Sequence, residues 1–206
     1  MGEPWICVDG VDGVGKTTIT GALAAALSIS AAPEFSSAPF GQALKSAVRS
    51  SPHYISTSPA GQSLVFLGDF FEVYSSAVAP RVRDGEPVIS DRGYLSKYAY
   101  QEVVLSSRYE PAAARRLLDA VFAFLPPPAL TIYLTAPVDV LVDRLIRRDG
   151  SCDDSRREFL VQADRAARAR LRREPILPSM ILDTNRPVAE LLAEIEPVVR
   201  WTIRRS

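Results

Sequence analysis

The chain is poor in the residues on which several classes of protein depend. Its 206 residues include one histidine, His53, and two cysteines, Cys7 and Cys152. Two cysteines make no disulfide framework, and they do not have the spacing of a metal-ligand motif. This excludes a small disulfide-stapled scaffold and a zinc-finger type of domain.

An excess of charge and long apolar runs are also absent. The formal net charge is zero and 47% of the residues are hydrophobic, which gives no indication of a polyanionic partner. No apolar run approaches the ~20 residues of a membrane span. The first residues, Met1–Trp5, lack the basic and apolar regions of a signal peptide. We therefore expect one cytoplasmic domain over residues 1–206, with no nucleic-acid and no membrane partner.

Lysine is scarce, whereas arginine is abundant. The only lysines are Lys16, Lys45 and Lys97, against 21 arginines. The composition is typical of a GC-rich genome, in which arginine codons replace lysine codons. A lysine that is kept in such a background indicates a requirement, which applies to Lys16 and makes Lys97 a residue of interest.

Residues 10–17 form a complete P-loop, the motif that most restricts the function. The loop follows an apolar strand-like segment, Trp5–Asp9, and precedes a helix-like segment that begins near Lys16. Its glycines allow a tight turn that aims backbone N–H groups at phosphate oxygens, Lys16 supplies a point charge, and the Thr17 hydroxyl can ligate Mg²⁺. The positive end of the helix dipole adds to this field. The residues expected to bind ATP here are Gly10, Asp12, Gly13, Val14, Gly15, Lys16, Thr17 and Thr18.

Apolar strand-like segments alternate with helical ones along the chain. Ser58 is predicted to be the N-cap of a helix whose first residue is Pro59. The alternation predicts an α/β fold in which a parallel sheet lies between helices on both faces, with ligands beyond the carboxyl ends of the strands. The expected strands are 5–9, 29–32, 87–90, 130–134 and 180–182, and the expected helices are 16–28, 40–50, 59–85, 94–105, 111–124, 137–148, 155–173 and 187–200.

A second phosphate site is predicted where the strand after Pro87 ends in Asp91 and Arg92. The two residues then lie at the same edge of the sheet as the P-loop. Asp91 can hold a water bound to Mg²⁺, and Arg92 can form a forked pair with a phosphate. A surface ion pair at a strand end is the plain alternative, and the neighbouring P-loop favours the functional interpretation.

Over nearly its full length the chain resembles the thymidylate kinase family of P-loop nucleoside monophosphate kinases. The family has an acidic residue inside its P-loop, as Asp12 is here. Its Asp-Arg strand is followed by the pattern Ser…Ala-Tyr-Gln, which is Ser96…Ala99-Tyr100-Gln101 in this chain. The segment Leu130–Leu134 resembles the family's strand before its lid, and Ile181–Val188 resembles its last strand and adenine-side loop. The Asp-Arg…Ala-Tyr-Gln signature is far more specific than the P-loop alone.

The resemblance implies a transfer of the γ-phosphoryl group of ATP to a pyrimidine nucleoside monophosphate, with Mg²⁺ and in a homodimer. It implies that Asp12 faces the sugar 3′-hydroxyl of the acceptor, Phe66 stacks on its base and Arg92 holds its 5′-phosphate. Tyr100 lies against the sugar 2′ carbon, with Gln101 nearby. The remaining implied residues are Glu34, Phe70, Ser96 and Lys97 around the acceptor, and Asn185 and Arg186 beside the adenine of ATP.

A lid is expected at about residues 147–157. The P-loop has Gly13 where some family members place an arginine, and the resemblance then implies that a lid arginine reaches the phosphates. The sequence does not decide which; the candidates are Arg147, Arg148, Arg156 and Arg157.

The departures from the family pattern lie mainly around the acceptor. Only Glu34 is kept from the family's Arg-Glu-Pro-Gly-Gly loop; Phe70 replaces an arginine that follows Asp69, and Lys97 replaces a small polar residue that contacts thymine. Thr135 stands where the family has an aspartate. The acceptor is therefore dTMP or a related or modified pyrimidine nucleotide.

Two other functions stay open at this point. A deoxynucleoside kinase would phosphorylate a 5′-hydroxyl, with Glu34 as the base. A nucleotide-gated switch or binding module would use the P-loop without an acceptor, although the chain has no guanine-reading Asn-Lys-x-Asp motif.

Overall fold

A computed structural model describes residues 4–50, 56–173 and 178–205. The sheet is five-stranded with the order β2-β3-β1-β4-β5, and all four pairings are parallel. The strands are β1 (Trp5–Asp9), β2 (Ser30–Ala32), β3 (Val88–Asp91), β4 (Leu130–Thr135) and β5 (Ser179–Asp183). The predicted parallel sheet with helices on both faces is confirmed.

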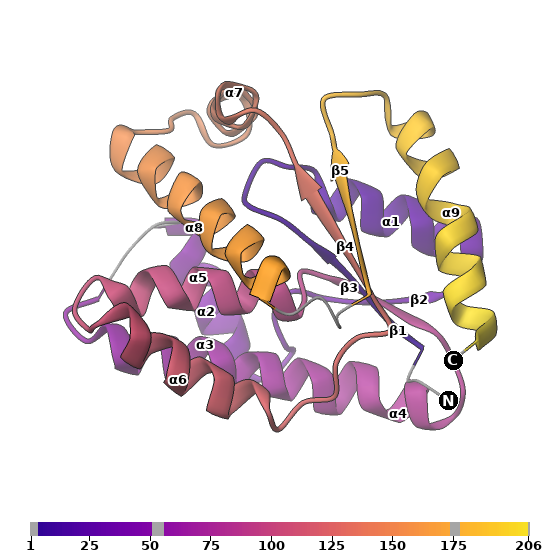
Figure 1. Ribbon diagram of the computed structural model, residues 1–206, viewed down its shortest axis with the longest axis horizontal. Helices are drawn as coiled ribbons and strands as arrows, with labels where there is room; N and C mark the ends of the chain where they lie inside the picture. The colour runs from indigo at the N-terminus through magenta and orange to yellow at the C-terminus, as the bar shows by residue number, and fades with distance from the viewer. Residues whose placement is uncertain (1–3, 51–55, 174–177, 206) are drawn as a thin grey trace.

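The helices form two outer layers. One face of the sheet is covered by α1 (Lys16–Leu27) and α9 (Val188–Arg205), and the other by α3 (Pro59–Val73), α5 (Tyr94–Ser106), α6 (Pro111–Phe122) and α8 (Asp154–Arg173) (Figure 1). Helix α2 (Pro39–Ser50) precedes α3, and α7 (Val138–Asp149) lies at the carboxyl rim of the strands. Because both faces are covered, the central strands are mostly apolar, and every residue of β1 is buried.

A π-helical turn interrupts the helix that was predicted to run from Pro59 to Gly85. The α-helix gives way to a π turn at Tyr74–Val78, and α4 (Ala79–Arg83) continues it. Pro80 lacks the N–H that would bond to the carbonyl of Ser76, and the wider turn accommodates this missing donor. At the other end the predicted N-cap is confirmed, since Ser58 Oγ accepts a hydrogen bond of 3.3 Å from the Gly61 N–H.

The predicted boundaries agree with the observed ones within a few residues, except at the chain's last helix. Helix α9 continues to Arg205, whereas the sequence predicted an end at Arg200. Its Leu191, Ile195 and Val199 are buried, and Thr202 extends the same buried stripe one turn further, so packing against α1 maintains the helix. His53 lies outside the described residues.

Candidate functional site: two anion sites at one rim

The P-loop joins the carboxyl end of β1 to the start of α1. Gly10, Gly13 and Gly15 all have positive φ, at 144°, 82° and 98°, a region that glycine adopts without strain. The predicted use of these glycines for a tight turn is therefore confirmed. Lys16 is 7% exposed, and its ammonium donates a hydrogen bond of 2.9 Å to the Val11 carbonyl.

Thr17 and Asp91 meet at the predicted metal position. Thr17 Oγ1 donates a hydrogen bond of 2.7 Å to Asp91 Oδ2. Asp91 Oδ1 is buried and has no hydrogen-bond partner among the described residues. Magnesium ions favour oxygen ligands and keep several waters, so a hydroxyl beside an unused carboxylate oxygen fits a hydrated Mg²⁺. No cluster of three metal-ligating residues occurs in the described part of the chain, so nucleotide phosphates would have to supply further ligands.

Arg92 lies beside the P-loop, and this is the decisive spatial relation. Its guanidinium is 2.5 Å from Asp12 Oδ1 and 2.7 Å from Glu34 Oε1. The guanidinium carbon is 4.6 Å from the centre of the Tyr100 ring, a cation–π distance. The Tyr100 hydroxyl in turn accepts a hydrogen bond of 2.9 Å from the Asp12 N–H. Strands β1 and β3 thus bring two separate sequence motifs into direct contact.

The backbone at Arg92 is in a conformation that non-glycine residues rarely adopt. Its φ is +72°, which costs about 1–3 kcal/mol and is often found at functional sites. Hydrogen bonds on both sides hold this turn. The Arg92 N–H donates to the Val8 carbonyl at 3.0 Å, and the buried Asp9 carboxylate accepts from the N–H groups of Gly93, Leu95 and Ser96 at the start of α5.

The charges at this rim shift one another's pKa values. Burial alone would raise the pKa of Asp12, but the positive charges of Arg92 and Lys16 outweigh it and hold that pKa well below its usual value. Burial, helped by repulsion from Arg92, lowers the pKa of Lys16 to about 8 against the attraction of Asp12, Glu34 and Asp91. Asp12 therefore stays ionised near neutral pH, while the lowered pKa of Lys16 makes its charge sensitive to pH above about 8.

This shift predicts a pH dependence. Only the protonated Lys16 attracts phosphate, so kcat/KM for ATP, which reports the free enzyme, should fall about tenfold per pH unit above about pH 8. The check is a pH profile of kcat/KM for ATP between pH 6.5 and 9.5. A profile that stays flat up to pH 9.5 would contradict the proposed role of the Lys16 charge.

The candidate acceptor region, predicted around Glu34, Phe66 and Lys97, contains side chains from the loop after β2, from α3 and from α5. The rings of Phe35 and Phe66 are 6.4 Å apart and tilted. The Lys97 ammonium, whose pKa burial lowers, lies 4.8 Å from the Phe35 ring centre and donates a hydrogen bond of 3.2 Å to the Glu34 carbonyl. Gln101, one turn further along α5, has a buried Oε1 with no hydrogen-bond partner among the described residues.

Two residues predicted at the acceptor lie elsewhere. Phe70 is 2% exposed and packs in the core against Trp5 and Phe122, so we leave it out of the site. Ser96 is also buried, and its hydroxyl exchanges hydrogen bonds with the backbone of Gly10, where it supports the P-loop. Phe66 and Phe70 are four residues apart on α3, but only Phe70 reaches the core, whereas Phe66 contacts Phe35.

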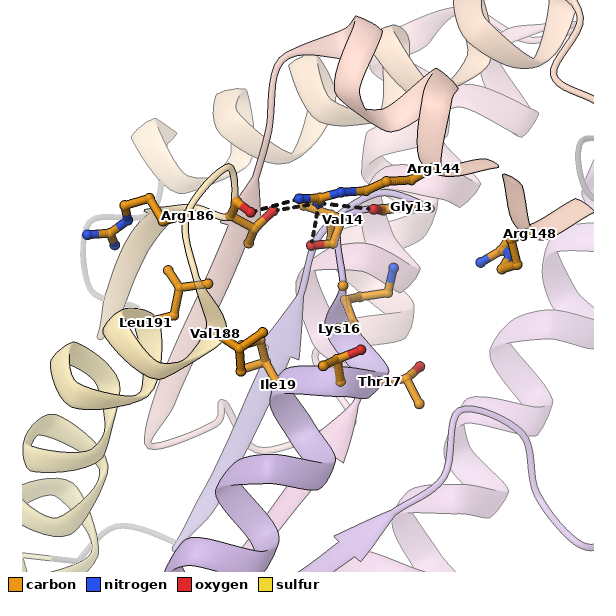
Figure 2. Close-up of a pocket in the computed structure, with 13 residues that line it drawn as sticks. Gly13, Val14, Lys16, Thr17, Ile19, Arg144, Arg148, Arg186, Val188 and Leu191 are labelled. Atoms are coloured by element: carbon orange, nitrogen blue, oxygen red, sulfur yellow. Dashed lines mark hydrogen bonds between the residues drawn. The ribbon is translucent and has the colours of Figure 1, made fainter. Parts of the chain in front are cut away.

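A cavity of about 560 Å³ opens beside the P-loop (Figure 2). Its walls come from the P-loop, α1, α7, the segment between β5 and α9, and the start of α9. Of the two residues predicted beside the adenine of ATP, Arg186 lines this cavity, whereas the exposed Asn185 does not. The lining residues are Gly13, Val14, Gly15, Lys16, Thr17, Thr18, Ile19, Arg144, Arg148, Thr184, Arg186, Val188 and Leu191.

The four candidate lid arginines have different surroundings. Arg148 lines the cavity, and its hydrogen bonds to Asp149 lower the pKa of that carboxyl to about 2. Arg156 is buried and pairs with Asp149 at 2.7 Å. Arg157 pairs with Asp139 at the surface, and Arg147 is exposed with no hydrogen bond or ion pair to a described residue. The geometry therefore favours Arg148 as the residue that faces the phosphates.

Arg144 and Thr184 are site residues that sequence reasoning missed. Arg144 lies one turn before Arg148 on α7, and Thr184 directly precedes the predicted Asn185. The helical spacing of Arg144 and Arg148 was the available signal. It was hidden by the many surface arginines of the following helix.

A comparison with protein-family models places most of the chain in one family. The model described as thymidylate kinase matches residues 8–195. A probable thymidylate kinase of Pyrobaculum aerophilum is 28% identical over 97% of this chain and 98% of the relative. A probable thymidylate kinase of Natronomonas pharaonis is 32% identical over 68% of this chain and 70% of the relative.

Solved structures support the fold. The crystal structure of thymidylate kinase from Ehrlichia chaffeensis has a TM-score of 0.69 and covers 97% of this chain and 100% of its own, at 18% identity. At that identity the likeness concerns the fold alone. In the described ranges, no helix combines the length and the apolar character needed to cross a membrane.

Proposed function

The chain belongs to the thymidylate kinase family, and from this premise we propose that it transfers the γ-phosphoryl group of ATP to the 5′-phosphate of dTMP. One observation carries the proposal: Arg92 contacts Asp12 of the P-loop at 2.5 Å. A donor site around Lys16 and an acceptor site around Arg92 then adjoin at one rim of the sheet, as an in-line transfer between two bound phosphates requires.

The reaction needs positioning and charge neutralisation more than proton transfer. The acceptor phosphate oxygen is already anionic near pH 7, so no general base is required. Lys16 and the P-loop N–H groups hold the donor phosphates, Arg92 holds the acceptor phosphate, and Arg148 approaches from α7 when the lid closes. Thr17 and Asp91 would hold Mg²⁺, which neutralises phosphate charge when bound. Arg92 must exchange part of its pairing with Asp12 and Glu34 for the incoming phosphate.

The acceptor base is assigned to the space beside Phe66, Lys97 and Gln101. The ammonium of Lys97 has three N–H donors, and one acceptor, the Glu34 carbonyl, is found for it among the described residues. The unused Gln101 Oε1 is an acceptor on the same helix face, four residues away. A 2,4-dioxopyrimidine presents a carbonyl oxygen beside an N–H, which complements this donor and acceptor.

Lys97→Met is expected to raise the KM for dTMP about 10- to 100-fold, since a hydrogen bond from a charged donor contributes about 1.5–3 kcal/mol. The KM for ATP should stay within twofold. Steady-state kinetics with the exposed Lys45→Met as control measure both. A dTMP KM within twofold of wild type in Lys97→Met would remove Lys97 from the base site.

An ADP-release screen tests the function itself. Purified protein with ATP and Mg²⁺ is assayed with dTMP, dUMP, dCMP, CMP, UMP, 5-substituted analogues and thymidine. We expect the highest kcat/KM with dTMP. Release with thymidine but not with dTMP would establish a nucleoside kinase, and ATP binding without acceptor-dependent release would establish a binding module. Glu34, the base that a nucleoside kinase would need, is paired with Arg92, which favours the monophosphate acceptor.

Homodimeric assembly and a cytoplasmic location remain predictions from the resemblance and the composition.

A further inference from the structure

Helix α7 lies directly against the P-loop. At Gly13 a Cβ atom would be 3.1 Å from the Leu141 carbonyl oxygen and 3.2 Å from the Leu145 side chain, both on α7. The positive φ of Gly13 is a second feature that favours glycine at this position in this chain. The absence of a side chain therefore allows the helix backbone to approach the phosphate loop, and it places the next residues of α7 within reach of the loop carbonyls.

Arg144 lies on α7 and lines the cavity beside the P-loop. One terminal nitrogen lies 3.3 Å from the Gly13 carbonyl oxygen, 3.5 Å from that of Val14 and 3.0 Å from Thr184 Oγ1, to all of which it donates. The other donates to the Thr184 carbonyl at 2.8 Å. Figure 2 shows the guanidinium between the P-loop and the segment after β5. Both terminal nitrogens of Arg144 are thus engaged by protein oxygens on two different segments.

Thr184 is itself held firmly. It is 5% exposed, its N–H donates to the Thr135 carbonyl at 2.8 Å, and its hydroxyl also lies 3.2 Å from that oxygen. Thr135 ends β4 and Thr184 follows β5. Arg144 therefore connects the P-loop to a rigid corner of the sheet that lines the same cavity.

We propose that Arg144 is a positioning residue that joins the P-loop and the segment after β5 into one donor-binding unit. A phosphate cradle needs its N–H groups turned toward the anion, and its buried carbonyls need donors on the other side. Arg144 supplies these donors for Gly13 and Val14 and fixes their peptide planes. The proposal rests on the proposed use of a nucleotide donor, and it adds a residue outside the P-loop and outside the predicted lid.

Binding measurements test this role without turnover. Wild type, Arg144→Met and Arg144→Lys are titrated with ADP and with inorganic pyrophosphate by calorimetry, with the exposed Arg116→Met on α6 as control. Arg144→Met should weaken both ligands at least tenfold, because the loop is no longer held. Arg144→Lys should recover less than half of that loss in free energy, since a lysine has one nitrogen and lacks the second one, which holds the Thr184 carbonyl in the wild-type protein.

Three results would overturn the proposal. The first is an ADP affinity of Arg144→Met equal to that of wild type. The second is an ADP affinity of Arg144→Lys equal to that of wild type, which would leave only a charge effect. The third is a variant that loses affinity for ADP but not for pyrophosphate. If Arg144→Met does not fold, Thr184→Val replaces it; we expect a three- to tenfold loss for both ligands, and unchanged binding contradicts the connection. Because these titrations need no acceptor, a wild-type protein inactive on dTMP would refute the proposed function while leaving this test intact.

Discussion

Lys16→Ala is expected to lower kcat/KM for ATP by at least 10²–10³-fold. The Lys16 ammonium is the only buried lysine charge within the P-loop, and removal of one preorganised charge from a phosphoryl-transfer site typically costs ~3–4 kcal/mol in the transition state. The loss should be larger in kcat than in the affinity for ADP, because the charge faces the β- and γ-phosphates. Steady-state kinetics together with ADP titration separate the two.

The control for this substitution is Lys45→Ala, a change of the same type on the exposed surface of α2. It should leave kcat and both KM values within twofold of wild type. Thermal unfolding of Lys16→Ala should show a folded protein, since burial of this ammonium is itself unfavourable, as its lowered pKa indicates. A folded Lys16→Ala protein with more than one tenth of wild-type kcat would contradict the donor-site assignment.

Arg92→Ala is expected to have a comparable effect, at least 10²-fold, expressed in kcat/KM for dTMP. The substitution removes the guanidinium that would hold the acceptor phosphate, takes from Glu34 its ion-pair partner, and leaves Asp12 with the Lys16 ammonium at 3.9 Å. The carboxylate charge that is no longer neutralised repels an incoming phosphate dianion, so the loss should exceed that of a single hydrogen bond. Affinity for ADP should change far less than the kinetics toward dTMP.

Arg92→Lys and the exposed Arg108→Ala complete the comparison. Lysine keeps the charge but loses the fork, so we expect a loss intermediate between wild type and Arg92→Ala. Arg108→Ala, beyond the end of α5, should behave as wild type. If the Arg92→Ala enzyme turns over dTMP near the wild-type rate, Arg92 does not hold the acceptor phosphate and the proposed function loses its main support.

The sequence predicted the fold because its local signals agreed with one another. Short apolar segments alternated with helical ones, glycine and proline marked the boundaries, and the P-loop follows a buried strand, so the parallel sheet and its functional rim could be inferred without coordinates. Lys16, Thr17, Asp91 and Arg92 were predicted as candidate site residues in the same way, because each belongs to a contiguous motif whose chemistry requires its residue type.

Other features depended on packing between distant segments. Phe66 and Phe70 have the same residue type on the same helix, yet only the tertiary contacts with Phe35 and with Trp5 distinguish a half-exposed ring from a core residue. The role of Arg144 was hidden for the same reason. Its hydrogen-bond partners lie 131 and 40 residues away in the chain, and no local pattern encodes such a meeting. The sequence by itself thus determined the chemistry of the two proposed anion sites, because that chemistry lies in contiguous motifs. The tertiary structure decided which side chains line them, because that choice is made by contacts between segments that are neighbours only in the folded chain.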